Sequence, residues 1–159
     1  MTTQGLDAKG YLAGWLSAVT AMTVKDLEAL PDDSWTQNFG GCARPANELL
    51  ADTITNLRWT TGAMKQEESN AYHEMGALTE ALTTKELAIT TLNQAAEEFA
   101  EALHAASDEL LNATVMAPWQ MPTPLFMLAT ISVNHIWYHD GQINYIHGLL
   151  GDEKVYWMG

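Results

Sequence analysis

Cysteine and basic residues are the scarcest features of this sequence. The single cysteine, Cys42, excludes an internal disulfide and any zinc or iron–sulfur site built from several cysteines. Any metal would therefore be held by nitrogen and oxygen atoms. Only 7 lysine and arginine residues stand against 20 acidic ones, which gives a net charge of −13 and leaves no basic stripe for phosphate groups. Nucleic acid and anionic membranes are therefore not expected partners.

Long hydrophobic runs are also missing. No stretch approaches the roughly 20 apolar residues of a membrane span, and "MTTQGLDAKG" lacks the charged and apolar regions of a signal peptide. We therefore expect a cytoplasmic protein. A hydrophobic content of 47% supports a sizeable core in a chain of this length, so we expect a single domain over residues 1–159.

The alternation of polar and apolar residues that marks β-strands is absent, and helical spacing takes its place. A first helix, with Asp7 as its N-cap, is indicated by apolar residues on one face: Tyr11, Leu12, Trp15, Leu16, Val19 and Met22. The stretch "TVKDLEAL" predicts a further short turn. The residues that follow, "PDDSWTQNFGGCARP", have the composition of a long ordered connection.

Three further helices are predicted. The second starts at Pro45 and runs to about Lys65, and the polar residues 66–82 predict a crossover with one helical piece. The third starts at Thr83, which forms a capping box with Glu86, and its apolar stripe continues to Leu110. In the last, Thr123 caps a helix that begins at Pro124 and ends at Leu150, before Gly151. The sequence thus predicts an all-α fold, a four-helix bundle with a crossover connection.

Two histidines stand four residues apart in the last predicted helix, in "NHIWYHDGQINYIHGLLGD". On a helical wheel His135 and His139 lie about 40° apart inside the apolar stripe, with Gln142 on the same face. This separation lets two imidazoles share one ion. The spacing alone leaves three interpretations open: metal ligands, a hydrogen-bonded pair of core histidines, or the remains of a site that no longer works.

The stretch "HIWYHDGQINYIHGLLGD" resembles the final helix of the DinB/YfiT-like superfamily, in which a His-x-x-x-His pair is followed by Gly-Gln and an apolar run. The stretch "LPDDSWTQNFGGCARPANELLADTITNLRW" is similar to the family's approach to its second helix. The resemblance implies a four-helix bundle, often dimeric, with a divalent metal held by three histidines in a cleft. It also implies an activity of the kind known in the family, whose characterised members include thiol-dependent transferases and isomerases.

The third metal ligand is where the sequence departs from the family. The family pattern resembles "ELLAH", whereas this chain has "ELLAD", so the resemblance puts Asp52 in the ligand position. One carboxylate with two histidines is a known set for non-haem iron. Periodicity points elsewhere, because Asp52 lies about 135° from the apolar centre of its helix, as a solvated surface carboxylate would. Glu48 and Asn56, one turn to either side, are alternative ligands or supporting groups.

The resemblance therefore implies a DinB-like, metal-dependent enzyme with Asp52, His135 and His139 as ligands of Ni, Zn or Fe. A transferase or hydrolase acting on a small molecule, with a low-molecular-weight thiol and a homodimeric state, follows from the resemblance. The alternative is a non-catalytic dimeric bundle or binding protein with a degenerate site. The other histidines are predicted bystanders, with His104 at the border of the apolar stripe of its helix and both His73 and His147 exposed. Cys42 is predicted to be a buried or bystander cysteine. Core packing is the expected role of the tryptophans, with a cleft or dimer interface as the alternative: Trp35, Trp59, Trp119, Trp137 and Trp157.

Overall fold

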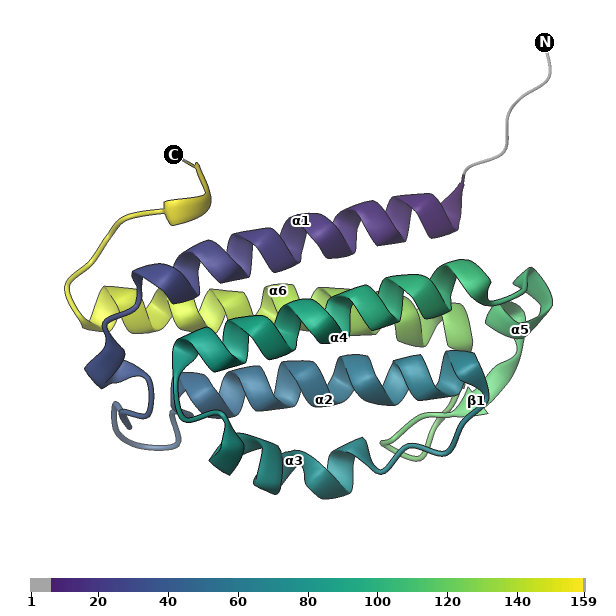
Figure 1. The fold of residues 1–159 in the computed structure, drawn as a ribbon, viewed down its shortest axis with the longest axis horizontal. Helices are drawn as coiled ribbons and strands as arrows, with labels where there is room; N and C mark the ends of the chain where they lie inside the picture. Colours follow the sequence, from purple (N-terminus) through teal and green to yellow (C-terminus); the bar gives the residue numbers. More distant parts are fainter. Residues whose placement is uncertain (1–6, 159) are drawn as a thin grey trace, which may run out of the picture.

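The computed structural model describes residues 7–158 and is built almost entirely from helices (Figure 1). Four long helices form the body of the protein: α1 (Ala8–Ala29), α2 (Ala46–Lys65), α4 (Lys85–Ala105) and α6 (Leu125–Leu149). The smaller elements lie between or after them: the helices α3 (Ala71–Ala81) and α5 (Asp108–Asn112), the strands β1 (Thr114–Met116) and β2 (Pro122–Pro124), and the 3-10 turns η1 (Asp32–Ser34) and η2 (Tyr156–Met158).

The four long helices pack as a bundle. Helix α2 packs against α4 and α6, and α1 packs against the same two helices. Figure 1 shows that α2 and α4 run in the same direction. Between these two helices in the sequence, α3 brings the chain back along α2. Helix α3 is therefore the helical piece of the predicted crossover. The four-helix bundle with a crossover is confirmed.

The core consists of apolar side chains from all four long helices. Phe99, Leu16, Leu27, Leu50 and Leu57 are among those with almost no exposed surface. Among the described residues, no helix combines the length and the apolar character that crossing a bilayer requires.

The tryptophans divide between core and surface. Trp35 is buried, whereas Trp119 and Trp137 are exposed. Core packing, the role expected for all of them, therefore holds for Trp35 but is wrong for these two.

Helix α1 agrees with the prediction at its start and differs later. The Asp7 carboxylate accepts a hydrogen bond from the backbone N–H of Gly10, as an N-cap does. The helix then continues through "TVKDLEAL" without a break, so the separate short turn predicted there is wrong. Tyr11, placed on the inner face by periodicity, is 70% exposed, because the buried stripe follows Leu12, Leu16 and Val19 instead.

Two other helix starts are shifted from their predicted positions. The N-cap of α4 is Thr84, whose hydroxyl accepts from the backbone N–H of Leu87, so the predicted capping box at Thr83 is wrong by one residue. Helix α6 begins at Leu125 after Pro124, and Thr123 lies in strand β2 instead of capping the helix. Its end is confirmed, since Leu150 is the C-cap and Gly151 has a positive φ of 84°.

The stripe from Leu92 to Leu110 is divided between two helices. Helix α4 ends at Ala105, and the Ser107 hydroxyl then caps the short helix α5 by accepting from the backbone N–H of Leu110. Apolar spacing continued across the break, which is why periodicity joined the two segments. The prolines after α5 belong to a two-stranded antiparallel hairpin, in which Pro122 and Pro124 lie in β2 and Val115 pairs with Thr123, although no strand was predicted. Strands of three residues are too short to show an alternating pattern.

The connection between α1 and α2 is ordered as predicted. Trp35 is its anchor: the indole N–H donates to the backbone carbonyl of Leu82 at 2.8 Å, and the Trp35 carbonyl accepts from the N–H of Asn47 at 3.2 Å. These contacts tie the connection to the end of α3 and to the first turn of α2. The connection leads through Arg44 directly into α2.

Candidate metal centre

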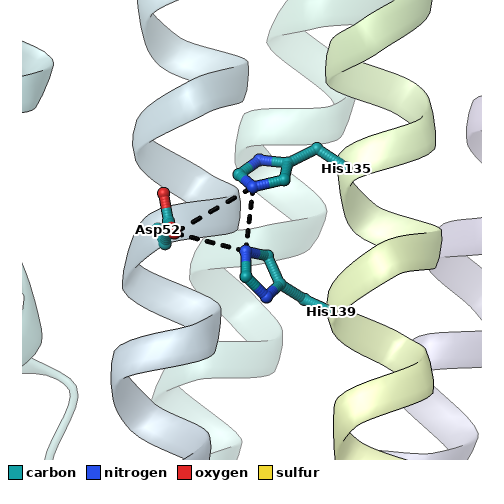
Figure 2. A group of neighbouring side chains, drawn as sticks. All are labelled: Asp52, His135 and His139. Atoms are coloured by element: carbon teal, nitrogen blue, oxygen red, sulfur yellow. Dashed lines mark hydrogen bonds and ion pairs between the residues drawn. The ribbon is translucent and has the colours of Figure 1, made fainter. Parts of the chain in front are cut away.

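Asp52 on α2 and the two histidines on α6 face one another across the contact between these helices (Figure 2). The Asp52 Oδ2 atom lies 3.2 Å from His139 Nε2 and 4.0 Å from His135 Nε2. The two Nε2 atoms are 2.9 Å apart. One ligand atom from each residue can be chosen so that all three lie within 4.8 Å of one another. The structure therefore brings the three predicted ligands together.

Burial differs among the three side chains. His139 is 1% exposed, whereas Asp52 and His135 are 19% and 21% exposed. The group thus reaches solvent on the side of Asp52 and His135 and is closed behind His139. The interpretation of Asp52 as a solvated surface carboxylate is wrong, because α2 packs against α6 and α3 as well as α4 and its Asp52 side chain faces α6.

Gln142 fixes the orientation of the His139 ring. Its side-chain oxygen lies 2.6 Å from His139 Nδ1 and accepts a hydrogen bond when that nitrogen carries the proton. In this tautomer Nε2 presents its lone pair to Asp52 Oδ2, so that two acceptors face each other at 3.2 Å. In the other tautomer Nε2 carries the proton and donates to Asp52 Oδ2. A hydrogen-bonded partner such as Gln142 is typical of metal-ligating histidines.

Arg44 adds a positive charge at the edge of the group. Its Nη1 donates to Asp52 Oδ2 at 2.7 Å, and its Nη2 lies 3.5 Å from both ring nitrogens of His139. The guanidinium therefore lies over the imidazole while holding the carboxylate. Sequence reasoning missed this residue, because it precedes α2 in a connection where periodicity carries no information.

The pKa values of the group follow from these contacts. Burial alone would raise the pKa of Asp52, but hydrogen bonds with His139 and Arg44 and the nearby histidines outweigh it and hold that pKa well below its ordinary value. Burial, with the neighbouring His139, lowers the pKa of His135 to about 4. Near neutral pH the site therefore combines an ionised carboxylate with a neutral His135, which is the protonation state that a metal ion requires.

Tyr72 on α3 lies beside this group. Its hydroxyl accepts a hydrogen bond from the Asn56 side-chain amide at 2.9 Å. Burial raises the pKa of Tyr72, and the charge of Asp52 adds to this effect. Asn56 thus contacts Tyr72, which lies beside the centre, whereas Glu48 lies outside the ligand group.

A sequence model of the DinB family matches residues 1–157. This chain belongs to the DinB family. The resemblance inferred from two stretches of the sequence is thus confirmed over nearly the full length of the chain. None of the curated proteins compared with this DinB-family sequence matches it.

Two solved structures are similar to this DinB-family chain. The mycothiol-dependent maleylpyruvate isomerase gives a TM-score of 0.68, and a histidine-to-alanine mutant of it gives 0.71. Both are 10% identical in sequence, and each match covers 85% of this chain. The chain spans 60% of the length of those isomerase chains. At this identity the likeness shows a shared fold.

The remaining histidines and Cys42 were predicted as bystanders, and His147 is the exception. His104, His73 and Cys42 are exposed, as bystanders would be. His147, predicted to be exposed, is 1% exposed. The prediction for His147 is wrong because α1 covers that face of α6, where the His147 Nε2 donates to the backbone carbonyl of Asp26 at 2.9 Å.

A second buried polar cluster lies between α1 and α6. Asp26 and Asp140 are 0% and 2% exposed, and the side-chain amide of Asn144 donates to both carboxyl groups, at 2.7 and 3.4 Å. Among residues 7–158 no lysine or arginine forms an ion pair with either carboxyl group. Burial raises the pKa of Asp140 to about 7, and the charge of Asp26 contributes further. The pair is therefore most stable when it carries a proton.

Proposed function

We propose that this DinB-family protein is a metal-dependent enzyme in which Asp52, His135 and His139 hold one divalent ion. The observation that carries the proposal is the convergence of the three ligand atoms within 4.8 Å. Two imidazoles and a carboxylate suit nickel, zinc or iron, and three protein ligands leave a coordination position for a substrate. When bound, such an ion supplies Lewis acidity, which stabilises a thiolate or polarises a carbonyl group.

The surrounding residues support this role in defined ways. Gln142 holds the His139 ring so that Nε2 is the ligating atom, and Arg44 keeps Asp52 ionised. The exposed edge at Asp52 and His135 gives a small molecule access. We infer that the reaction is a group transfer or hydrolysis that uses a low-molecular-weight thiol in the cytoplasm, with the chain acting as one DinB-like domain. The mycothiol-dependent isomerases with this fold are the support for the thiol.

A non-catalytic bundle with a degenerate site is the alternative. The ion pair between Arg44 and Asp52 favours it, because the arginine compensates the carboxylate at 2.7 Å without any ion. The two proposals differ in metal content, which is measurable without knowledge of the substrate.

The deciding experiment is elemental analysis of protein purified without added metal, followed by loading with cobalt(II). We expect about one ion per chain, because three converging ligands bind a divalent ion with useful affinity. Adding 2-mercaptoethanol to the cobalt-loaded protein should produce a sulfur-to-cobalt charge-transfer absorption. Protein that retains no nickel, zinc, iron or cobalt would support the degenerate bundle, and cobalt retention without a response to thiol would reject thiol dependence alone.

We also infer that the protein is a homodimer formed through the outer face of α6. Met127, Tyr138 and Tyr145 are 55%, 61% and 68% exposed and follow one line along this helix. Exposed apolar stripes of this kind commonly mark interfaces. Sedimentation at micromolar concentration should show a dimer that Tyr145→Glu shifts toward monomer. Tyr11→Glu, at an equally exposed tyrosine on α1, should leave it intact, and a monomeric parent would contradict the inference.

A further inference from the structure

Arg44 contacts Asp52 and His139, although it is not itself a candidate metal ligand. One side of its guanidinium is committed to Asp52 Oδ2 and lies over the His139 ring, while the side chain remains 37% exposed. A guanidinium carries five N–H donors, and the structure assigns partners to its Nη1 and Nη2. Arg44 therefore reaches from the candidate metal centre to solvent beside the partly exposed Asp52.

The charges of the centre show what Arg44 adds. Asp52 and Arg44 cancel each other, and the two histidines contribute nothing when neutral. With a divalent ion the same group carries a net charge of about +2, because the arginine already offsets the carboxylate and leaves the charge of the ion uncompensated. This concentration of positive charge stands out in a chain of net charge −13. A positive site on a strongly acidic protein selects anionic ligands.

The shape of the guanidinium narrows the class of anion. Its planar fork matches the two oxygens of a carboxylate, and its contact with Asp52 uses one N–H group only, from Nη1 to Oδ2. The other lysine and arginine ion pairs in the described chain are made by Lys9 with Asp108 and by Lys85 with Asp32, and neither pair involves a candidate ligand. Arg44 is thus the cation positioned to contact a molecule at the centre.

We propose that Arg44 binds the carboxylate of a small-molecule substrate at this centre, so that the enzyme acts on carboxylate-bearing compounds. This assignment rests on the proposed metal-dependent function. Arg44 contacts the substrate, not the ion, and its pairing with Asp52 holds the guanidinium in place before the substrate arrives. The substrate carboxylate would then accept hydrogen bonds from the guanidinium N–H groups of Arg44 that are now exposed to solvent.

The test uses cobalt(II)-loaded protein and acetate as the probe, with the visible absorption of cobalt as the readout and ionic strength held constant. Acetate should shift the spectrum with saturation, and the neutral analogue acetamide should not. Arg44→Gln should weaken acetate binding by at least about tenfold while cobalt content stays near one per chain, because hydrogen bonds to charged groups are worth about 1.5–3 kcal/mol. Arg44→Lys should recover part of the affinity, since it keeps the charge but loses the fork.

Arg58→Gln is the matched control. It removes the same charge from α2 at a residue outside the ligand group, and it should bind acetate like the parent. Equal acetate affinity in Arg44→Gln and the parent, with cobalt bound in both, would overturn the assignment of Arg44 and leave the metal proposal standing. A parent that retains no cobalt would overturn both.

Discussion

Replacement of His139 by alanine is expected to abolish metal retention. His139 is the most buried of the three candidate ligands, and its ring is fixed by Gln142 on one side and faces Asp52 on the other. Without this imidazole two partly exposed ligands remain, and we expect the affinity for zinc or cobalt to fall by more than about 100-fold. Metal analysis after gel filtration measures the effect directly. His73→Ala, at an exposed histidine on α3, is the control and should retain the parent's metal content.

Asp52 variants separate the interpretations of the site that the sequence left open. If the centre binds an ion, Asp52→His should retain it or bind zinc more tightly, because it restores three imidazoles, while Asp52→Ala should weaken binding in a folded protein. If the site has decayed, the parent should hold no metal and Asp52→His should create binding. If the histidines are only core residues, His139→Ala should lower stability by about 1–3 kcal/mol without changing metal content. Absence of metal from both the parent and Asp52→His would refute the metal hypothesis.

Replacement of Asp140 by asparagine is expected to stabilise the protein at alkaline pH. The folded state raises the pKa of Asp140 to about 7, so between about pH 4 and 7 it holds a proton that the unfolded chain releases. The free energy of unfolding of the parent therefore falls as pH rises through this range, and the full decrease is reached above about pH 7. An asparagine side chain cannot ionise and avoids this decrease. We expect a gain of about 2–4 kcal/mol near pH 8 and little difference near pH 4.

Urea unfolding of parent and variant at several pH values tests this expectation. Comparing the two chains at each pH is essential, because the lowered pKa of His135 acts in the opposite direction and makes the parent gain stability as pH rises from about 4. Asp33→Asn, at an exposed carboxylate in η1, should show no such pH-dependent gain. A gain for Asp140→Asn that is the same at pH 4 and pH 8 would contradict the proton-sharing explanation.

The helices could be predicted because their capping residues and apolar stripes are local features. Asp7, Lys65 and Gly151 mark real boundaries, and the spacing of His135 and His139 correctly indicated that their side chains meet. A helix start was wrong where two neighbouring threonines could each serve as the cap, as with Thr83 and Thr84 at the start of α4. The break before α5 was hidden because the apolar spacing continued through it.

The parts of the site that escaped prediction depend on contacts between elements. Helical periodicity compared Asp52 with a single apolar centre and could not include the cover that α6 and α3 provide. Arg44 meets His139 from a connection without periodicity, and Asp26 meets Asp140 only because α1 and α6 pack together. The burial of His147 has the same origin. Pairings of this kind are set by tertiary packing, which no single stretch of sequence encodes.

The positions of the ligands along the chain also determine when the centre can exist. Asp52 is on the second helix, whereas both histidines are on α6, and Arg44 is separated from His139 by 95 residues. A nascent chain that ends before α6 therefore holds only the carboxylate and its arginine. Since an ion that binds only the docked arrangement stabilises it by mass action, metal supply would select fully folded chains over those in which the last helix is detached. An ion bound at this centre would thus couple synthesis, folding and metal loading through the final helix.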